Sequence, residues 1–175
     1  MSGFQDKRIN AERSDSGSEE EFINLYKNLH HSLLSYGMRI CSNEELTRDC
    51  IHEVFLELWE KNDRFYLVKE IKPYLFRCLR NLLIDNFKKQ KPFLKNTPEE
   101  TLATGEELST DSLFSISQED VIIEKESEDE SKRLISNFIS KLSSRQKEVF
   151  YLKFYDGLSN KEISQVTGIH YQSVR

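Results

Sequence analysis

The sequence predicts an all-α protein in which two small helical domains are joined by a flexible acidic linker. Apolar residues recur at three- and four-residue steps along several segments, which is the spacing of one face of an α-helix. Only six Gly and three Pro occur in 175 residues, and 31% of the residues are charged, a composition typical of helical globular proteins. A chain of this length can form one ordinary domain or two small ones.

The first domain is expected over residues 21–92, after a disordered amino-terminal segment, residues 1–20. An apolar stripe predicts its first helix: Phe22, Leu25, Tyr26, Leu29, Leu33, Tyr36 and Ile40. The second helix has an apolar stripe: Leu46, Cys50, Ile51, Val54, Phe55, Leu58 and Trp59. Its opposite face is acidic and carries Asp49, Glu53, Glu57 and Glu60. We therefore expect this helix to pack inward through its apolar side and to expose its carboxylates.

A basic third helix follows, beginning at Pro73, a residue well suited to a first helical turn. Its predicted core side holds Leu75, Cys78, Leu79 and Leu82. Its other side presents Arg77, Arg80, Asn81, Ile84, Lys88 and then Lys91. The loop 61–72 before it carries two aromatic residues among cations: Arg64, Phe65, Tyr66, Lys69 and Lys72. Cations beside exposed rings suit single-stranded nucleic acid, although Phe65 and Tyr66 could equally cap the hydrophobic core.

Charge separates these segments from the rest of the chain. Residues 64–91 carry eight basic and two acidic side chains, whereas residues 99–132 carry two basic and twelve acidic ones. The region 93–131 also loses helical periodicity, and it is expected to be a flexible acidic linker. A net charge of −5 therefore conceals two basic segments able to bind nucleic acid locally.

The second domain is expected over residues 132–175 as a helix-turn-helix. Ser143 with Gln146, and Ser159 with Glu162, have the spacing of capping boxes at two helix starts, and Gly168 supplies the turn. The second helix of this motif enters the major groove, but only about one turn of it is present here, so the recognition helix is expected to be incomplete. The candidate DNA contacts are Ser159, Lys161, His170, Tyr171, Gln172 and Arg175.

Two segments, in this order along the chain, resemble sigma factors of the sigma-70 superfamily, specifically those of the extracytoplasmic-function (ECF) type. They are residues 49–59 (DCIHEVFLELW) and residues 74–85 (YLFRCLRNLLID). His52 stands where the family usually has Gln. The resemblance implies that the second helix docks on the clamp helices of the largest polymerase subunit through Asp49, His52, Glu53, Leu56, Glu57 and Glu60. It also implies that the third helix and its loop bind and melt the minus-ten element, and that residues 132–175 read the minus-thirty-five element beside the flap region of polymerase.

The expected function is therefore that of an alternative sigma factor, which binds core RNA polymerase and promoter DNA in the cytoplasm. A conventional helix-turn-helix regulator would explain residues 132–175 equally well, but it leaves the acidic second helix and the basic third helix unexplained. No catalytic motif, cofactor site or metal-ligand spacing is present, and no apolar run is long enough for membrane insertion. Cys41, Cys50 and Cys78 are expected to be reduced and buried. An anti-sigma factor or a recruiting protein is a further possible partner.

Overall fold

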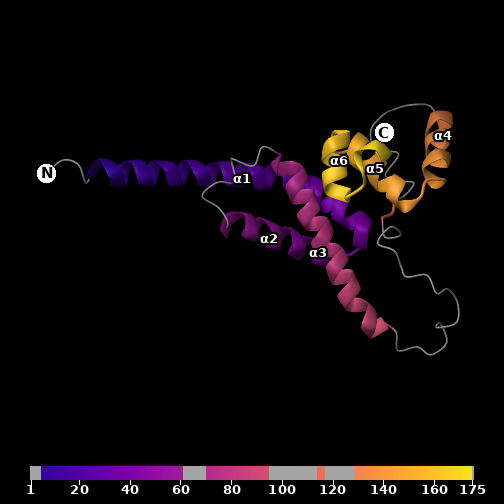
Figure 1. Cartoon of the computed structure of the whole chain (residues 1–175), viewed down its shortest axis with the longest axis horizontal. Coiled ribbons are helices and arrows are strands. Elements are labelled where there is room, and N and C mark those ends of the chain that lie inside the picture. The colour runs from indigo at the N-terminus through magenta and orange to yellow at the C-terminus, as the bar shows by residue number, and fades with distance from the viewer. Residues whose placement is uncertain (1–4, 61–69, 95–113, 117–128, 175) are drawn as a thin grey trace.

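The computed structural model describes residues 5–60, 70–94, 114–116 and 129–174. Within these ranges the chain is helical and contains no strand, which confirms the all-α prediction. The elements, labelled in Figure 1, are α1 (Gln5–Cys41), α2 (Glu44–Glu60), α3 (Ile71–Leu94), α4 (Asp129–Ser140), α5 (Ser144–Phe154), α6 (Asn160–Thr167) and a 3₁₀ turn, η4 (Tyr171–Ser173). Among the described residues, no helix combines the length and the apolar character that a membrane crossing requires.

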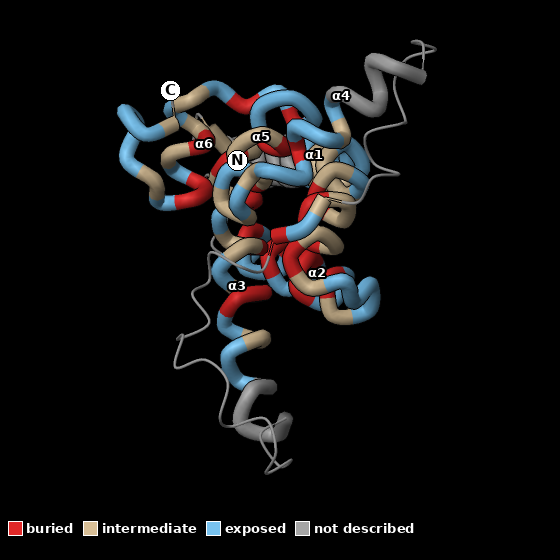
Figure 2. The backbone as a smooth tube through the Cα atoms, turned by 90° about the vertical axis from the view of Figure 1, so that its right-hand side faces the viewer, coloured by how far each residue is buried: buried red, intermediate tan, exposed pale blue. Residues whose placement is uncertain are grey.

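Helices α1, α2 and α3 pack against one another to form the amino-terminal unit. Its core is built from the inner stripes of the three helices, and the fully buried side chains include Leu33, Tyr36, Ile51, Leu75, Phe76, Leu79 and Leu83. Asn43 sets the start of α2, because its side-chain oxygen accepts a hydrogen bond from the Leu46 amide at 3.0 Å. Figure 2 shows that buried residues gather where the three helices meet and that α3 has none from Asp85 to Lys89.

The carboxyl-terminal unit consists of α4, α5, α6 and η4, and its helix boundaries follow the predicted signals. Ser143 and Ser159 cap α5 and α6, each with a reciprocal bond from the side chain three residues later, so both capping boxes are confirmed. Gly157 and Gly168 adopt positive φ angles of 67° and 71°, which end α5 and α6 in conformations that favour glycine.

Two expected boundaries are wrong. Helix α1 begins at Gln5, so residues 5–20 are helical in the structure and not disordered. This segment lacks an apolar stripe, and seven of its sixteen residues are Ser, Asp, Asn or Gly, which are not strong helix formers. Its helix is an extension of one already nucleated by the packed part of α1. At the other boundary, α4 begins at Asp129, inside the region expected to be linker.

The two units are packed against each other instead of being held apart. Helix α6 lies along α3, and the carboxyl end of α1 approaches α5 (Figure 1). Part of the expected linker contributes to this contact, since Phe114 is buried and the Ser115 amide donates to the Arg39 carbonyl at 2.8 Å. Residues 95–113 and 117–128 lie outside the described residues, so the rest of the linker prediction is not tested.

Candidate functional site

The outer face of α2 carries every residue that the sequence assigned to polymerase binding. Asp49, His52, Glu53, Leu56, Glu57 and Glu60 are all exposed. The opposite side of the same helix is buried and holds Thr47, Cys50, Ile51, Val54, Phe55 and Leu58. The burial pattern of α2 therefore matches the predicted division into an apolar inner face and an acidic outer face, except that Trp59, which was predicted on the inner face, is exposed.

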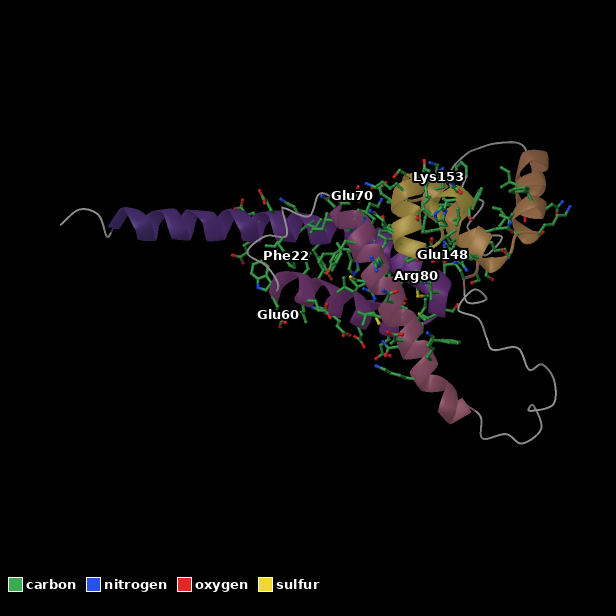
Figure 3. All side chains as sticks on the ribbon, viewed as in Figure 1. Phe22, Glu60, Glu70, Arg80, Glu148 and Lys153 are labelled. Atoms are coloured by element: carbon green, nitrogen blue, oxygen red, sulfur yellow. The ribbon has the colours of Figure 1, made fainter. Side chains whose placement is uncertain are left out.

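An apolar groove lies between α1 and this outer face of α2. Its volume is about 300 Å³, and its lining includes Phe22 and Ile23 from α1 and Leu56 and Trp59 from α2. Leu56 is 54% exposed and Trp59 is 42% exposed, although the Trp59 ring packs against Phe22 with centroids 4.8 Å apart. Figure 3 shows Phe22 and Glu60 at the same end of the α1–α2 pair. Large exposed apolar side chains grouped beside carboxylates are typical of a protein-binding surface.

Three of the predicted DNA-binding residues of α3 form one exposed stripe. Arg77, Asn81 and Lys88 are exposed and recur at steps of four and seven residues, so they lie on the same side of the helix. Ile84, which was predicted on this side, stands three residues after Asn81 and four before Lys88, so it belongs to the same side of the helix. Its side chain is nevertheless only 7% exposed, and its assignment to DNA stays a prediction.

Five other residues of this predicted surface cannot be placed. Arg64, Phe65, Tyr66 and Lys69 lie outside the described residues, and so does the side chain of Lys91. Their assignment to promoter DNA stays a prediction.

Lys72 and Arg80, which were also predicted to contact DNA, bind the carboxyl-terminal unit. Lys72 Nζ donates to the Asp156 carbonyl oxygen at 2.5 Å and lies 3.9 Å from Asp156 Oδ1. Arg80 Nε and Nη2 donate to Glu148 Oε1 and Oε2 at 2.7 and 3.2 Å, and the Arg80 side chain is only 13% exposed. In this arrangement both cations are engaged by acidic residues of α5 and the turn after it.

Glu148 was missed as a functional residue, although its position in the sequence carried a signal. It stands three and four residues before Tyr151 and Leu152, on the apolar side of α5, and it is 3% exposed. Its Oε1 also accepts a 2.6 Å hydrogen bond from the Tyr36 hydroxyl. Burial raises the pKa of Tyr36 well above its usual value, and the Glu148 carboxylate raises it further. We name Glu148, Arg80 and Tyr36 the Glu148 cluster; Figure 3 shows its acidic and basic members side by side.

The helix-turn-helix residues take several roles. Ser159 caps α6, and Lys161 Nζ lies 3.1 Å from Glu70 Oε1 of the amino-terminal unit. His170 caps the 3₁₀ turn, in which Tyr171 and Gln172 are exposed. Arg175 lies outside the described residues. The segment after Gly168 thus forms a 3₁₀ turn in place of the expected first turn of a recognition α-helix.

The other chemically reactive side chains do not assemble into a site. Cys41, Cys50 and Cys78 are free thiols, with Cys50 buried and the other two partly so. Burial raises the pKa of the Cys50 thiol, which keeps that residue protonated and unreactive. In the described ranges no three His, Cys, Asp or Glu residues gather as metal ligands would.

Comparison with known proteins identifies both units. Residues 25–93 match Sigma-70 region 2 and residues 132–175 match Sigma-70, region 4, and together they cover more than half of the chain. The ECF RNA polymerase sigma factor SigW of Bacillus subtilis is 25% identical over 178 residues, which span 97% of this chain and 88% of SigW. The ECF RNA polymerase sigma factor BldN of Streptomyces coelicolor is 27% identical over 158 residues, 90% of this chain but 56% of BldN.

A solved structure supports the fold. The sigma factor RpoE, in its complex with the anti-sigma factor NepR from Bartonella quintana, superposes with a TM-score of 0.57 at 16% identity, covering 89% of this chain and 88% of RpoE. A region 2 match is not expected of a conventional helix-turn-helix regulator, so that alternative is not favoured. The chain has a region 2 unit, which contains α2 with its buried apolar face and exposed acidic face, followed by a region 4 helix-turn-helix. It therefore belongs to the sigma-70 superfamily and is an alternative sigma factor of the ECF type.

Proposed function

We propose that this sigma factor binds core RNA polymerase through the exposed face of α2 and presents the α3 stripe to the minus-ten region of a promoter. The observation that carries the proposal is the division of α2: the residues at its inner positions are buried, whereas Leu56 and Trp59 are left exposed among carboxylates. An exposed apolar centre with a charged rim is the composition expected of a protein interface. The acidic rim suits a basic partner surface, such as the polymerase clamp helices.

The promoter-facing side is proposed to be the stripe of Arg77, Asn81 and Lys88, extended by the basic loop before α3. Arg77 and Lys88 are eleven residues apart, about 16 Å along the helix, so they can contact two phosphates that lie several nucleotides apart. The Asn81 amide between them can read a base edge. Residues 132–175 would contact the minus-thirty-five element and the flap region. Such a subunit works in the cytoplasm, where core polymerase transcribes the chromosome.

A protein inhibitor is proposed as a further partner. The similar sigma factor RpoE was solved in complex with an anti-sigma factor, NepR. The exposed apolar groove beside Leu56 offers such a partner a surface that polymerase also needs, so binding of the two would be competitive.

Charge reversal on α2 tests the polymerase interface. Glu53→Lys should lower the affinity for core polymerase at least tenfold, because a lysine would then face a basic partner surface. Glu44→Lys is a matched control: it makes the same change at the start of the same helix, on a different side, where Glu44 pairs with the exposed Arg48 at 2.6 Å. Both variants should keep their thermal unfolding within a few degrees of the parent.

Titration of core polymerase with each variant, followed by promoter-specific run-off transcription, gives the readout. Loss of affinity in Glu53→Lys alone supports the α2 interface. Equal affinities for Glu53→Lys and the parent would contradict it.

A further inference from the structure

The packing of α1 against α2 sets which residues of the two helices face each other. Phe22 packs on Trp59, and Tyr26, one turn later in α1, packs on Phe55, one turn earlier in α2. In both pairs the ring centroids are 4.8 Å apart. All four residues line the apolar groove described above. The two helices therefore run in opposite directions, and each further turn of α1 meets the preceding turn of α2.

Two histidines occupy the next step of this register. His30 stands one turn after Tyr26, and His52 stands about one turn before Phe55, so the two side chains come from facing turns of α1 and α2. His52 is exposed and lines the groove. His30 is partly buried, with its ring centroid 5.1 Å from that of Tyr26. The pair thus lies at one end of the groove.

The two histidines are close enough for their charges to interact. Burial lowers the pKa of the His30 imidazole below its usual value. Three nearby cationic groups lower this pKa further: Arg48, His31 and His52. Arg48 itself pairs with Glu44 at 2.6 Å. The other charged side chains within one turn of the pair, or lining the groove, are Glu19 and Lys27 of α1 and Asp49 and Glu53 of α2. Protonation of the pair therefore adds positive charge beside Arg48, at one end of a face that otherwise carries carboxylates.

We propose that His30 and His52 form a proton-sensitive contact for core polymerase: this face of the protein binds polymerase most tightly while both imidazoles are neutral, and more weakly in mild acid, when they are charged. The inference rests on the proposed function, because it takes the exposed face of α2 to be the polymerase interface. It adds a regulation of that interface by pH.

Two physical effects give this dependence the same sign. Histidine is the side chain whose charge normally changes between about pH 5 and 8. A basic partner surface, which the acidic rim of α2 suits, repels a protonated imidazole. The partner also removes water from His52, and loss of water disfavours the charged form. Polymerase binding therefore expels protons from the pair, and by linkage the affinity falls as the pH decreases.

Replacements at His52 test this charge without disturbing the core, because the side chain is exposed. His52→Gln gives a polar side chain that stays neutral at every pH, whereas His52→Arg gives one that stays positive. A double variant, His30→Gln with His52→Gln, removes both imidazoles. His31→Gln is the matched control, because it makes the same replacement at an adjacent exposed histidine that does not line the groove.

The experiment measures the affinity of each full-length protein for core polymerase by fluorescence anisotropy, at pH 7.5 and pH 6.0 and at one ionic strength. Polymerase titrates over this range, and so does the Asp156 carboxyl, whose pKa burial raises to about 6. Both are common to all the variants, so their effects cancel in the comparison. Between the two pH values the parent should lose at least about threefold more affinity than His52→Gln, and the double variant should lose the least. The control should follow the parent. At pH 7.5, His52→Arg should bind at least about threefold more weakly than the parent.

The outcomes separate this inference from the proposed function. A parent whose affinity falls no more steeply than that of His52→Gln would overturn the proton-sensitive contact. The same conclusion would follow if His52→Arg bound core polymerase as tightly as the parent at pH 7.5. In either case the polymerase interface on α2 stands if the parent binds at pH 7.5 and Glu53→Lys does not. A parent that does not bind core polymerase at pH 7.5 would instead overturn the proposed function. If the double variant does not fold, the two single replacements of His52 decide.

Discussion

Arg80 Nε donates to Glu148 Oε1 at 2.7 Å across the boundary between the two units. The same oxygen accepts a bond from the Tyr36 hydroxyl at 2.6 Å, so one carboxylate of α5 joins α1 and α3. Removing the Arg80 charge deprives the buried Glu148 carboxylate of a cationic partner, and the free energy lost in this way exceeds the net contribution of the pair. The free energy of unfolding should therefore fall strongly when either Arg80 or Glu148 is replaced.

A double-mutant cycle tests this coupling. Arg80→Met and Glu148→Gln should each lower the free energy of unfolding by about 3 kcal/mol, because each removes one charge from a buried ion pair. The double variant should lose at least about 1 kcal/mol less than the two single losses together. Denaturant unfolding measures the cycle, and the exposed Arg48–Glu44 pair provides a control cycle with an expected coupling below about 0.5 kcal/mol. Additive losses at Arg80 and Glu148 would contradict a shared ionic interaction.

Asp156 should make the folded protein more stable in mild acid than at neutral pH. Burial raises the pKa of its carboxyl to about 6, against the opposing influence of Lys72 on α3 and of Ser32 and Arg39 on α1. Its Oδ2 atom is buried without a hydrogen-bond partner in the described part of the chain, which agrees with a penalty on the charged form. A raised pKa means that the folded protein binds the proton more tightly than the unfolded chain. This contribution to stability is complete below about pH 4 and is lost as the pH rises through about 6.

The size of this change in stability follows from the shift in the pKa of Asp156. Ionised Asp156 costs the folded state about 3 kcal/mol, and roughly half of this cost disappears between pH 7.5 and pH 5. Asp156→Asn cannot ionise, so its free energy of unfolding should lack that share of the pH dependence. Parallel unfolding curves for the two proteins over this pH range give the difference. A variant whose pH profile coincides with that of the parent would show that Asp156 does not titrate there.

The sequence was sufficient to predict the individual helices, but it did not predict the contact between the two units. The capping boxes at Ser143 and Ser159 are local signals, and the structure has both helix starts where these signals place them. The two faces of α2 follow equally directly from its periodicity. Arg80 was assigned to DNA because it stands on the basic side of α3, and its partner Glu148 is 68 residues away. Periodicity within one helix cannot predict that partner, although an acidic residue on the apolar side of α5 was a sign that one existed.

Gly37→Ala should destabilise the amino-terminal unit even though alanine favours helices. Gly37 lies within α1, where this replacement alone would stabilise by about 1 kcal/mol. An added Cβ would overlap the Thr47 methyl group and lie 3.2 Å from Leu83 Cδ1. Thr47 cannot turn aside freely, because it is fully buried and its hydroxyl donates to the Asn43 carbonyl at 2.7 Å. The overlap forces α1 away from α2 and α3, as overpacking of a core does.

We expect a net loss of about 1–2 kcal/mol in the free energy of unfolding of Gly37→Ala. Ser35→Ala, a replacement two residues earlier in α1 at a partly exposed position, is the control for a change of helix propensity. Thermal unfolding of both variants gives the comparison. A Gly37→Ala protein more stable than the parent would show that the three helices do not approach as closely as described.

The exposed stripe of α3 should determine promoter opening once polymerase is bound. Arg77 and Lys88 are exposed on the same side of the helix and follow the acidic-faced α2 in the same unit, so they are placed to hold a DNA backbone while α2 holds polymerase. Arg77→Ala with Lys88→Ala removes two phosphate contacts. It should weaken DNA binding by the holoenzyme. The slope of log affinity against log salt concentration should become shallower by about 1.4–1.8, since each phosphate contact contributes about 0.7–0.9 to it.

Lys27→Ala with Lys141→Ala removes the same charge from exposed positions on α1 and just after α4 and serves as the control. Assembly with core polymerase should be unaffected in both double variants, because neither touches α2. Permanganate footprinting of promoter thymines then distinguishes binding from melting: reduced reactivity around the minus-ten element in the α3 variant alone would support the assignment, whereas full reactivity and an unchanged salt slope would remove α3 from the promoter interface.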